Sequence, residues 1–189
     1  MSVRLLIVFA ALFLTGIVVT VAAVNGPAGA SRSADANVGK SAVAVEPFPA
    51  PKGESSLRIA GVEHGNVAAH VTKVDFATLD RVARERRTVR EPFVKHDVEF
   101  TGLRIGEVLE RAGGQGSAGS LFIHALDDYH VELAISDIAS DALLATRADG
   151  KPIPIAQGGP IRLVFTSKGG LAANTDMWIW SIDSMRLTP

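Results

Sequence analysis

Cysteine is absent from the 189-residue chain. Its absence excludes disulfide bonds, a thiolate metal ligand and a thiol nucleophile. Aromatic residues are scarce at 6%, with two Trp and one Tyr, and the acidic and basic side chains nearly balance at a formal charge of −1. A chain with no basic stripe lacks the electrostatic footprint of nucleic-acid binding. We therefore expect an ordinary hydrophobic core to stabilise the fold, and no nucleic-acid partner.

One long hydrophobic run lies at the N-terminus. Arg4 precedes an uncharged apolar run from Leu5 to Val24, and the turn-forming residues 25–27 end it. The run is long enough to cross a hydrocarbon core of about 30 Å, whereas the small residues 28–30 (Ala-Gly-Ala) are typical of a signal-peptide cleavage site. We predict that residues 1–30 are a signal peptide or a membrane anchor. Because Arg4 keeps the N-terminus inside, the rest of the chain is expected to be extracytoplasmic, either periplasmic or at the cell surface.

The next segment has the composition of a spacer. Residues 31–56 are rich in Ala, Ser and Pro, and Pro47, Pro49 and Pro51 alternate. Alternating prolines favour an extended, partly stiff chain. We predict a linker over residues 31–56, followed by one globular domain over residues 57–189, a length that suits a single core.

Short strands dominate the predicted domain. Val131, Leu133 and Ile135 alternate with polar or small residues, which is typical of a strand with one buried face. Asp149-Gly150 predicts a tight turn, because both residue types tolerate positive φ. By such alternation and by short apolar runs, strands are expected at residues 57–60, 69–74, 88–89, 97–100, 121–125, 131–135, 161–165 and 177–182.

Only two segments carry a helical pattern. Phe76, Leu79 and Val82 recur at spacings of three, and Asp75 before them can cap a helix over residues 76–85. A second helix is expected over residues 106–112, where two glycines follow as a stop signal. The pattern indicates an α+β fold that is mostly β.

Several motifs of the second half of the domain occur in a fixed order. Tyr129 precedes an apolar strand, residues 143–145 read Leu-Leu-Ala, and residues 150–153 read Gly-Lys-Pro-Ile. Residues 158–164 then read Gly-Gly-Pro-Ile-Arg-Leu-Val. In order and spacing these motifs resemble the sulfite-oxidase-like oxidoreductase molybdopterin-binding domain family, with Asp128 in place of the Gly of the family's Gly-Tyr turn. The resemblance extends weakly to residues 57 and 187, and implies a single domain of that fold.

The resemblance also implies a molybdopterin pocket between residues 90–96 and residues 168–170. The pterin cofactor bears a phosphate, and cationic side chains and glycine-turn amides are its natural partners. Lys95 and Arg162 are further cations of this region. The candidate cofactor-binding residues are Arg90, His96, Tyr129, Lys168, Gly169 and Gly170.

Catalytic members of the family supply a cysteine from this region, and its sulfur coordinates molybdenum. Residues 88–96 here read Thr-Val-Arg-Glu-Pro-Phe-Val-Lys-His. Glu91 and His96 could replace the sulfur, but either would give a harder ligand than a thiolate. We therefore predict a non-catalytic ligand-binding module without catalytic or metal-binding residues.

Two alternatives stay open. One is an interaction or sensory-partner module of the cell envelope that keeps only the scaffold, and the other is a molybdenum oxidoreductase with a non-thiolate ligand. His124, Asp128 and His130 have only loose spacing for a metal site, and a Gly-x-Ser-x-Gly motif of serine hydrolases is absent. The expected partners are a small-molecule ligand or an envelope protein, and the membrane where residues 1–30 remain uncleaved.

Overall fold

The structure is a computed structural model, and it describes residues 45–63, 66–114, 116 and 118–189. The predicted signal peptide or anchor over residues 1–30, and residues 31–44 of the predicted linker, lie outside the described residues. Among the helices that are described, none is both long enough and apolar enough to cross a membrane.

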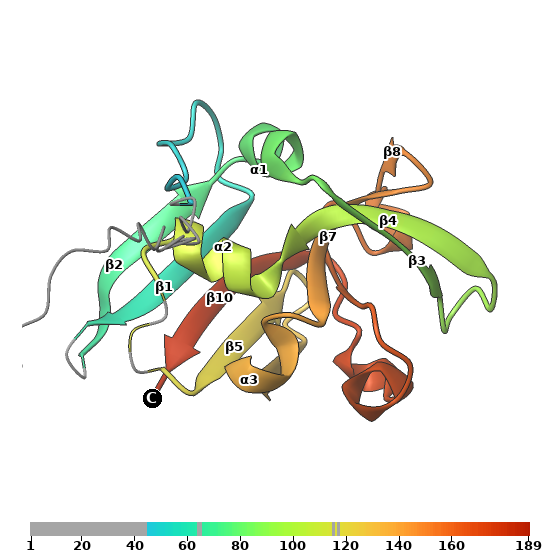
Figure 1. Cartoon of the computed structure of the whole chain (residues 1–189). Coiled ribbons are helices and arrows are strands. Elements are labelled where there is room, and N and C mark those ends of the chain that lie inside the picture. Colours follow the sequence, from blue (N-terminus) through green and yellow to red (C-terminus); the bar gives the residue numbers. More distant parts are fainter. Residues whose placement is uncertain (1–44, 64–65, 115, 117) are drawn as a thin grey trace, which may run out of the picture. The chain divides into compact units, whose positions relative to one another are not determined.

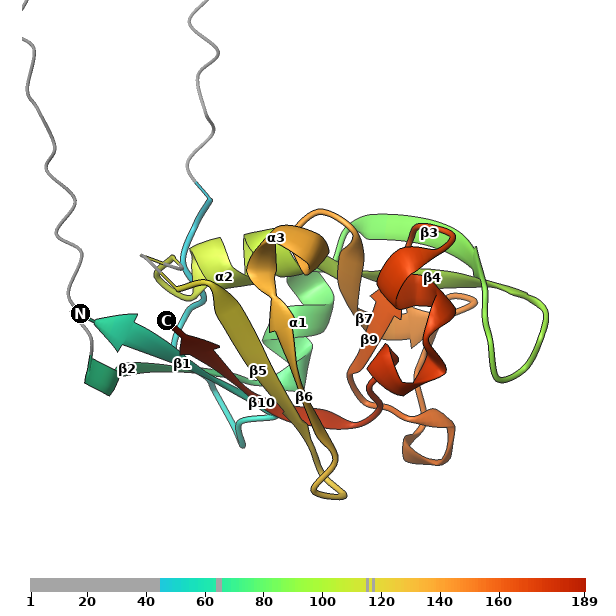
Figure 2. The same cartoon turned by 90° about the horizontal axis from the view of Figure 1, so that it is seen from below.

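Two five-stranded sheets make up the domain (Figures 1 and 2). In the first sheet the strand order is β2-β1-β10-β5-β6. Its strands are β1 (Leu57–Glu63), β2 (Asn66–Val74), β5 (Ser120–Ala125), β6 (His130–Ala134) and β10 (Ile182–Thr188). The central pair, β1 and β10, is parallel, and the other pairs are antiparallel.

The second sheet carries the motifs of the sequence. Its order is β3-β4-β7-β8, and β9 also pairs with β7. Its strands are β3 (Glu85–Arg90), β4 (Asp97–Arg104), β7 (Ala142–Ala148), β8 (Lys151–Pro152) and β9 (Arg162–Phe165). All four residues of β9 are buried, which places this short strand inside the fold.

Helices are few and short. The α-helices are α1 (Phe76–Val82), α2 (Ile105–Arg111) and α3 (Ile135–Ile138). Three single-turn 3₁₀ helices follow, η1 (Ile155–Gln157), η2 (Gly170–Ala173) and η3 (Thr175–Met177). The prediction of a mostly β fold with few helices is confirmed.

Local sequence signals account for several features of the chain. The Asp75 carboxylate accepts a hydrogen bond of 2.7 Å from the Thr78 amide and caps α1, as predicted. Asp149 and Gly150 have φ angles of 48° and 74°, as the predicted turn requires. Asp128 has a φ of 68°, and Asp is one of the few residues other than Gly that tolerates this conformation. This tolerance explains how Asp replaces the Gly of the family's turn.

The predicted end of the first helix is wrong. The helix ends at Val82, because Ala83 adopts an extended backbone instead of continuing the turn. Glu85 pairs with Gly102 as the first residue of β3, and its carboxylate accepts a hydrogen bond of 2.6 Å from Arg104 Nε. Strand pairing and this ion pair therefore override the helical pattern of residues 83–85.

The predicted closing strand and the end of β6 are also wrong. Strand β10 begins at Ile182, because Ser181 has a φ of 52° that interrupts an extended chain. Consequently the two indoles do not share a strand face: Trp178 is buried, whereas Trp180 is exposed. Ile135, expected as the last residue of a strand, instead begins α3.

Residues 45–56 lie along the domain. The Phe48 amide donates a hydrogen bond of 3.1 Å to the Arg111 carbonyl, and Arg111 Nη1 donates one of 2.8 Å to the Glu46 carbonyl. The Lys52 amide donates to the Asp75 carboxylate at 3.0 Å, and the Phe48 ring packs against the core. The described part of the predicted linker is thus bound to the domain.

Candidate ligand site

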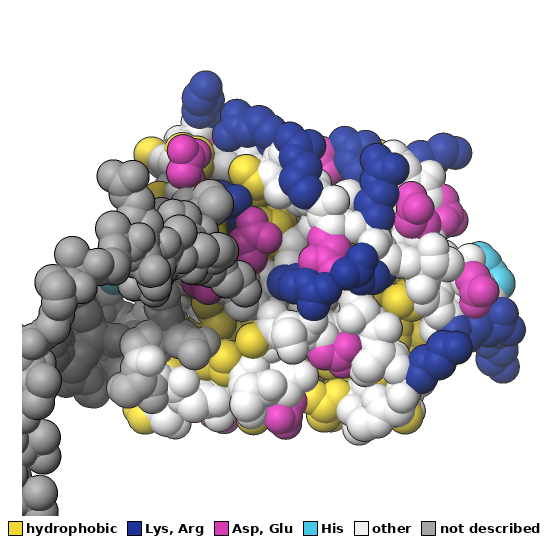
Figure 3. Space-filling model, in the orientation of Figure 1, with side chains coloured by type: hydrophobic (Ala, Val, Ile, Leu, Met, Phe, Trp, Pro, Cys, Tyr) yellow, Lys and Arg dark blue, Asp and Glu magenta, His cyan; other side chains and the backbone are white. Residues whose placement is uncertain are grey.

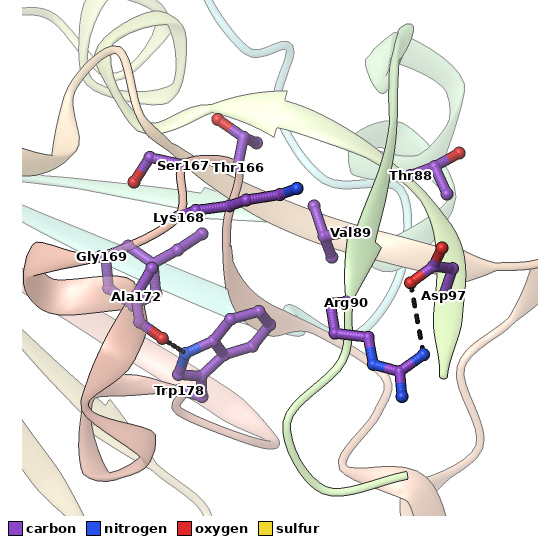
Figure 4. Close-up of a pocket in the computed structure, with 11 residues that line it drawn as sticks. Thr88, Val89, Arg90, Asp97, Thr166, Ser167, Lys168, Gly169, Ala172 and Trp178 are labelled. Atoms are coloured by element: carbon purple, nitrogen blue, oxygen red, sulfur yellow. Dashed lines mark hydrogen bonds and ion pairs between the residues drawn. The ribbon is translucent and has the colours of Figure 1, made fainter. Parts of the chain in front are cut away.

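A cavity of about 520 Å³ lies between β3 and the loop that follows β9. Figure 4 shows its two walls, with Thr88, Val89, Arg90 and Asp97 on one side and the segment from Thr166 to Gly169 on the other. Phe165, Ala172 and Trp178 complete the lining. We call this space the Lys168 cavity.

The walls of the Lys168 cavity carry two cations. Lys168 extends from its loop across the cavity toward Val89 (Figure 4). Arg90 Nη1 lies 3.7 Å from the Asp97 carboxylate, and the two side chains are 63% and 67% exposed. Such an exposed pair contributes little energy, so the Arg90 guanidinium can turn to a ligand at small cost.

Further arginines surround Arg90 on β3. This strand is an edge of the second sheet, and Arg86, Arg87 and Arg90 are all exposed. Figure 3 shows Lys and Arg side chains gathered along the edge over α1 and β3 in that view. Charges on an edge strand oppose pairing with another chain. Of these three arginines, only Arg90 lines the Lys168 cavity.

The loop after β9 is anchored on one carboxylate. The Thr166 amide donates a hydrogen bond of 2.8 Å to the Asp141 carbonyl, and the Thr166 and Ser167 hydroxyls donate to the Asp141 carboxylate at 3.0 Å and 2.6 Å. Both hydroxyls are therefore held in the wall. Gly169 and Gly170 follow with φ angles of 109° and 55°, which favour glycine at both positions.

The floor of the cavity is aromatic. The rings of Phe165 and Trp178 meet edge to face, with centroids 5.8 Å apart. The Trp178 Nε1–H donates a hydrogen bond of 3.1 Å to the Ala172 carbonyl of η2, which fixes the indole. The Lys168 cavity thus combines a fixed aromatic pair with the cations Arg90 and Lys168 in one lining.

The structure brings together some of the sequence-predicted residues and separates others. Arg90, Lys168 and Gly169 line the Lys168 cavity, and Gly170 follows directly in the chain. His96 lines a different cavity of about 360 Å³, and its Nδ1 lies 3.2 Å from the Val94 carbonyl. Tyr129 lines a third cavity of about 270 Å³.

Glu91 and Arg162 form a buried ion pair. Glu91 Oε1 accepts a hydrogen bond of 2.7 Å from Arg162 Nη2, with the side chains only 2% and 6% exposed. Glu91 Oε2 accepts from the amides of Phe93 and Val94 at 2.8 Å and 2.7 Å. Burial lowers the pKa of the Arg162 guanidinium, and its hydrogen bond to the Glu91 carboxylate opposes this shift. Both carboxylate oxygens of Glu91 are thus used inside the fold.

Sequence reasoning missed Phe165 and Trp178 as site residues, because both were assigned to strands of the core. Trp178 is indeed buried, but one side of its indole borders the Lys168 cavity. The available signal was position: Phe165 and Trp178 flank the loop of Lys168, Gly169 and Gly170, which the sequence had already marked as a candidate site.

The comparisons with known proteins match this fold. The sequence profile of the oxidoreductase molybdopterin binding domain matches residues 81–186, which is more than half of the chain. The chain belongs to this family. The resemblance found in the sequence is therefore confirmed.

Solved structures that are similar to this family member include the sulfane dehydrogenase SoxCD from Paracoccus pantotrophus. The identity is 18% and the TM-score is 0.55, and the match covers 70% of this chain and 37% of that chain. This domain thus spans about a third of the length of that enzyme, and the likeness shows the fold alone. No curated protein matches the sequence.

The residues of this family member fit the phosphate-bearing pterin of a molybdenum cofactor but not its metal. Arg90, Lys168 and the loop at Gly169 provide cations and backbone for a phosphate. For the metal, the chain has no cysteine, and the described residues contain no group of three His, Asp or Glu side chains able to hold an ion. His124, a candidate in such a group, instead has its Nδ1 2.8 Å from the Asp183 carboxylate. The donor set does not fit a thiolate-bound molybdenum.

Proposed function

We propose that this domain is an extracytoplasmic binding module that holds a small anionic ligand of pterin type in the Lys168 cavity, without redox turnover. One observation carries the proposal: Arg90 and Lys168 line one cavity with an aromatic floor, in a family member without cysteine. The apolar run at residues 5–24 supports export.

The chemistry of the walls supports an anionic group on the ligand. A guanidinium such as that of Arg90 binds a phosphate through two parallel hydrogen bonds, whereas the Lys168 ammonium acts as a point charge. Phe165 and Trp178 add aromatic side chains to the lining, with 0% and 5% of their surface exposed. The cavity, at about 520 Å³, has the size of a small-molecule site.

Glu91 is a poor substitute for the missing thiolate. Coordination of a metal by Glu91 would break its hydrogen bonds to Arg162 and to two backbone amides. The arginine would then be left buried without its counter-charge. This arrangement favours binding without turnover over the alternative of an oxidoreductase with an oxygen ligand.

Calorimetric titration with a pterin monophosphate tests the proposal. We expect saturable binding that weakens with added salt, and a loss of affinity of about tenfold or more for Arg90→Gln and for Lys168→Gln, because each removes a charge-assisted hydrogen bond. Lys151→Gln is the matched control, since Lys151 is exposed on β8 and does not line the cavity.

Equal affinity of all three variants, or no binding by the wild type, would count against the proposal. In the second case the interaction module becomes the better hypothesis. A pull-down from envelope extracts then tests whether the surface around the Lys168 cavity binds a protein. The wild type and Arg90→Gln are compared, and the variant should retain less of the partner.

A further inference from the structure

A second cavity shares Trp178 with the Lys168 cavity but has the opposite charge. Its volume is about 270 Å³, and besides Trp178 it is lined by three exposed aromatic side chains, Phe93, Tyr129 and Trp180, and by two acids, Asp127 and Asp176. No Lys, Arg or His of the described part of the chain lines it. We call it the Tyr129 cavity.

The three aromatic side chains are unusually exposed for their size. Phe93, Tyr129 and Trp180 are 44%, 45% and 37% exposed, and they come from separate segments, after β3, before β6 and before β10. The Phe93 ring meets the Trp180 indole edge to face at 4.9 Å. Contiguous exposed apolar surface of this kind marks a site of interaction.

Hydrogen bonds fix the walls of the Tyr129 cavity. The Tyr129 hydroxyl donates a hydrogen bond of 2.8 Å to the Asp176 carbonyl, and the Tyr129 amide donates to the Asp127 carboxylate at 3.2 Å. The Asn174 side chain accepts from the Asp176 amide at 3.1 Å. The aromatic ring and both acidic residues are therefore held together before any ligand arrives.

The charge of the Tyr129 cavity comes from its two acids. Arg162 lies near, with its guanidinium 4.6 Å from the Trp180 ring centroid. However, Arg162 is buried outside this cavity and is neutralised by Glu91 at 2.7 Å. Among the described residues, Asp127 and Asp176 are thus the only charged groups that line it, and they give it a negative potential.

We propose that the Tyr129 cavity binds a small organic ammonium cation of the alkylated, choline-like class. Aromatic faces attract such a cation through their quadrupoles, and this attraction is strongest for cations that hold water weakly. The two carboxylates add a long-range attraction that a neutral ligand of the same shape would not feel. This inference does not depend on the ligand of the Lys168 cavity.

Intrinsic fluorescence of the full chain provides the test, because both tryptophans of the sequence, Trp178 and Trp180, line the Tyr129 cavity. We expect choline and tetramethylammonium to change the emission with saturation. The uncharged isostere of choline, 3,3-dimethylbutan-1-ol, should produce no saturable change at the same concentrations.

Variants separate the aromatic contribution from the charge. Tyr129→Ala and the double variant Asp127→Asn/Asp176→Asn should each weaken choline binding about tenfold, whereas Tyr129→Phe, which keeps the ring, should retain most of it. Glu110→Gln on α2 is the control for the loss of an exposed acid, and an unchanged unfolding midpoint shows that each variant is folded.

A saturable response to the neutral isostere equal to that of choline would overturn the proposal. So would choline binding that the double Asp variant leaves unchanged, or the absence of saturation by choline in the millimolar range with folded wild-type protein.

Discussion

At the scale of single residues, the pair of Glu91 and Arg162 is the most consequential feature of this domain. Sequence reasoning treated Glu91 as a possible metal ligand and Arg162 as a further cation of the cofactor region, whereas the two lie buried against each other. The Arg162 Nε–H has no hydrogen-bond acceptor among the described residues. A buried pair that is incompletely satisfied contributes little net stability but makes the loss of either partner costly.

We expect Glu91→Ala to lower the free energy of unfolding by about 3 to 5 kcal/mol, because Arg162 keeps its charge without a partner. The double variant Glu91→Ala/Arg162→Met should be less destabilised than Glu91→Ala alone. Urea unfolding of the wild type, of Glu91→Ala, of Arg162→Met and of the double variant measures this difference, and simple additivity of the two substitutions would contradict it.

Leu163 tests the core position of β9. Leu163 is fully buried, so Leu163→Asp places an uncompensated carboxylate in the interior and should cost several kcal/mol, on the order of 4. Leu126→Asp is the matched control, because Leu126 is 61% exposed. Thermal unfolding compares the two variants, and similar midpoints would mean that β9 is not part of the core.

At the scale of elements, one carboxylate joins α1 to β7. Asp80 of α1 accepts hydrogen bonds from the Thr146 hydroxyl at 2.9 Å and from Arg147 Nε at 2.8 Å. The hydrogen bond from Arg147 lowers the pKa of Asp80, and burial opposes this shift. A lowered pKa in the folded state means that the stabilisation is present above the ordinary value of about 3.9 and is lost as the pH falls through the folded value.

Asp80→Asn should therefore destabilise the domain by about 1 to 3 kcal/mol at pH 7. Below about pH 4 the difference between wild type and variant should shrink, because the wild-type carboxyl becomes protonated as well. Thermal midpoints from pH 2.5 to pH 7 measure this effect, with Glu110→Gln as the control. A difference that stays constant across this range would contradict the role of the ionised Asp80.

The elements also show what the sequence could and could not predict. Alternation placed β5 and β6, and the Asp75 cap and the turn at Asp149 were read correctly because their chemistry is local. The end of α1 was misread, because it is set by the long-range pairing of Glu85 with Gly102. The start of β10 was misread, because it is set by the positive φ of Ser181. The site was only partly predictable for the same reason: pairing across β3, β4, β7 and β9 decides which loops meet at the Lys168 cavity.

At the scale of the whole molecule, the missing cysteine governs the expected chemistry. We expect the purified domain, produced in a host that makes and exports molybdopterin, to have no molybdenum-dependent sulfite or sulfoxide oxidoreductase activity. Metal analysis and dye-linked turnover measure this. Stoichiometric molybdenum, together with turnover that His96→Ala abolishes, would contradict it and favour the oxidoreductase hypothesis.

The folded unit should begin before β1. Because Phe48 packs on the core and Arg111 binds the Glu46 carbonyl, limited proteolysis should leave a fragment that starts near residue 45. Phe48→Ala should move the cut toward residue 57. Mass spectrometry of the fragments reads the boundary, and a wild-type fragment that starts at residue 57 would show that this contact is too weak to protect the segment.

The central position of β10 determines when the first sheet can form. Residues 182–188 insert between β1 and β5 in the middle of the first sheet. Until residues 182–188 have left the ribosome, β1 and β5 each keep an unpaired edge. The first sheet therefore closes only after the other described strands have been made, and its two halves wait for β10 to join them.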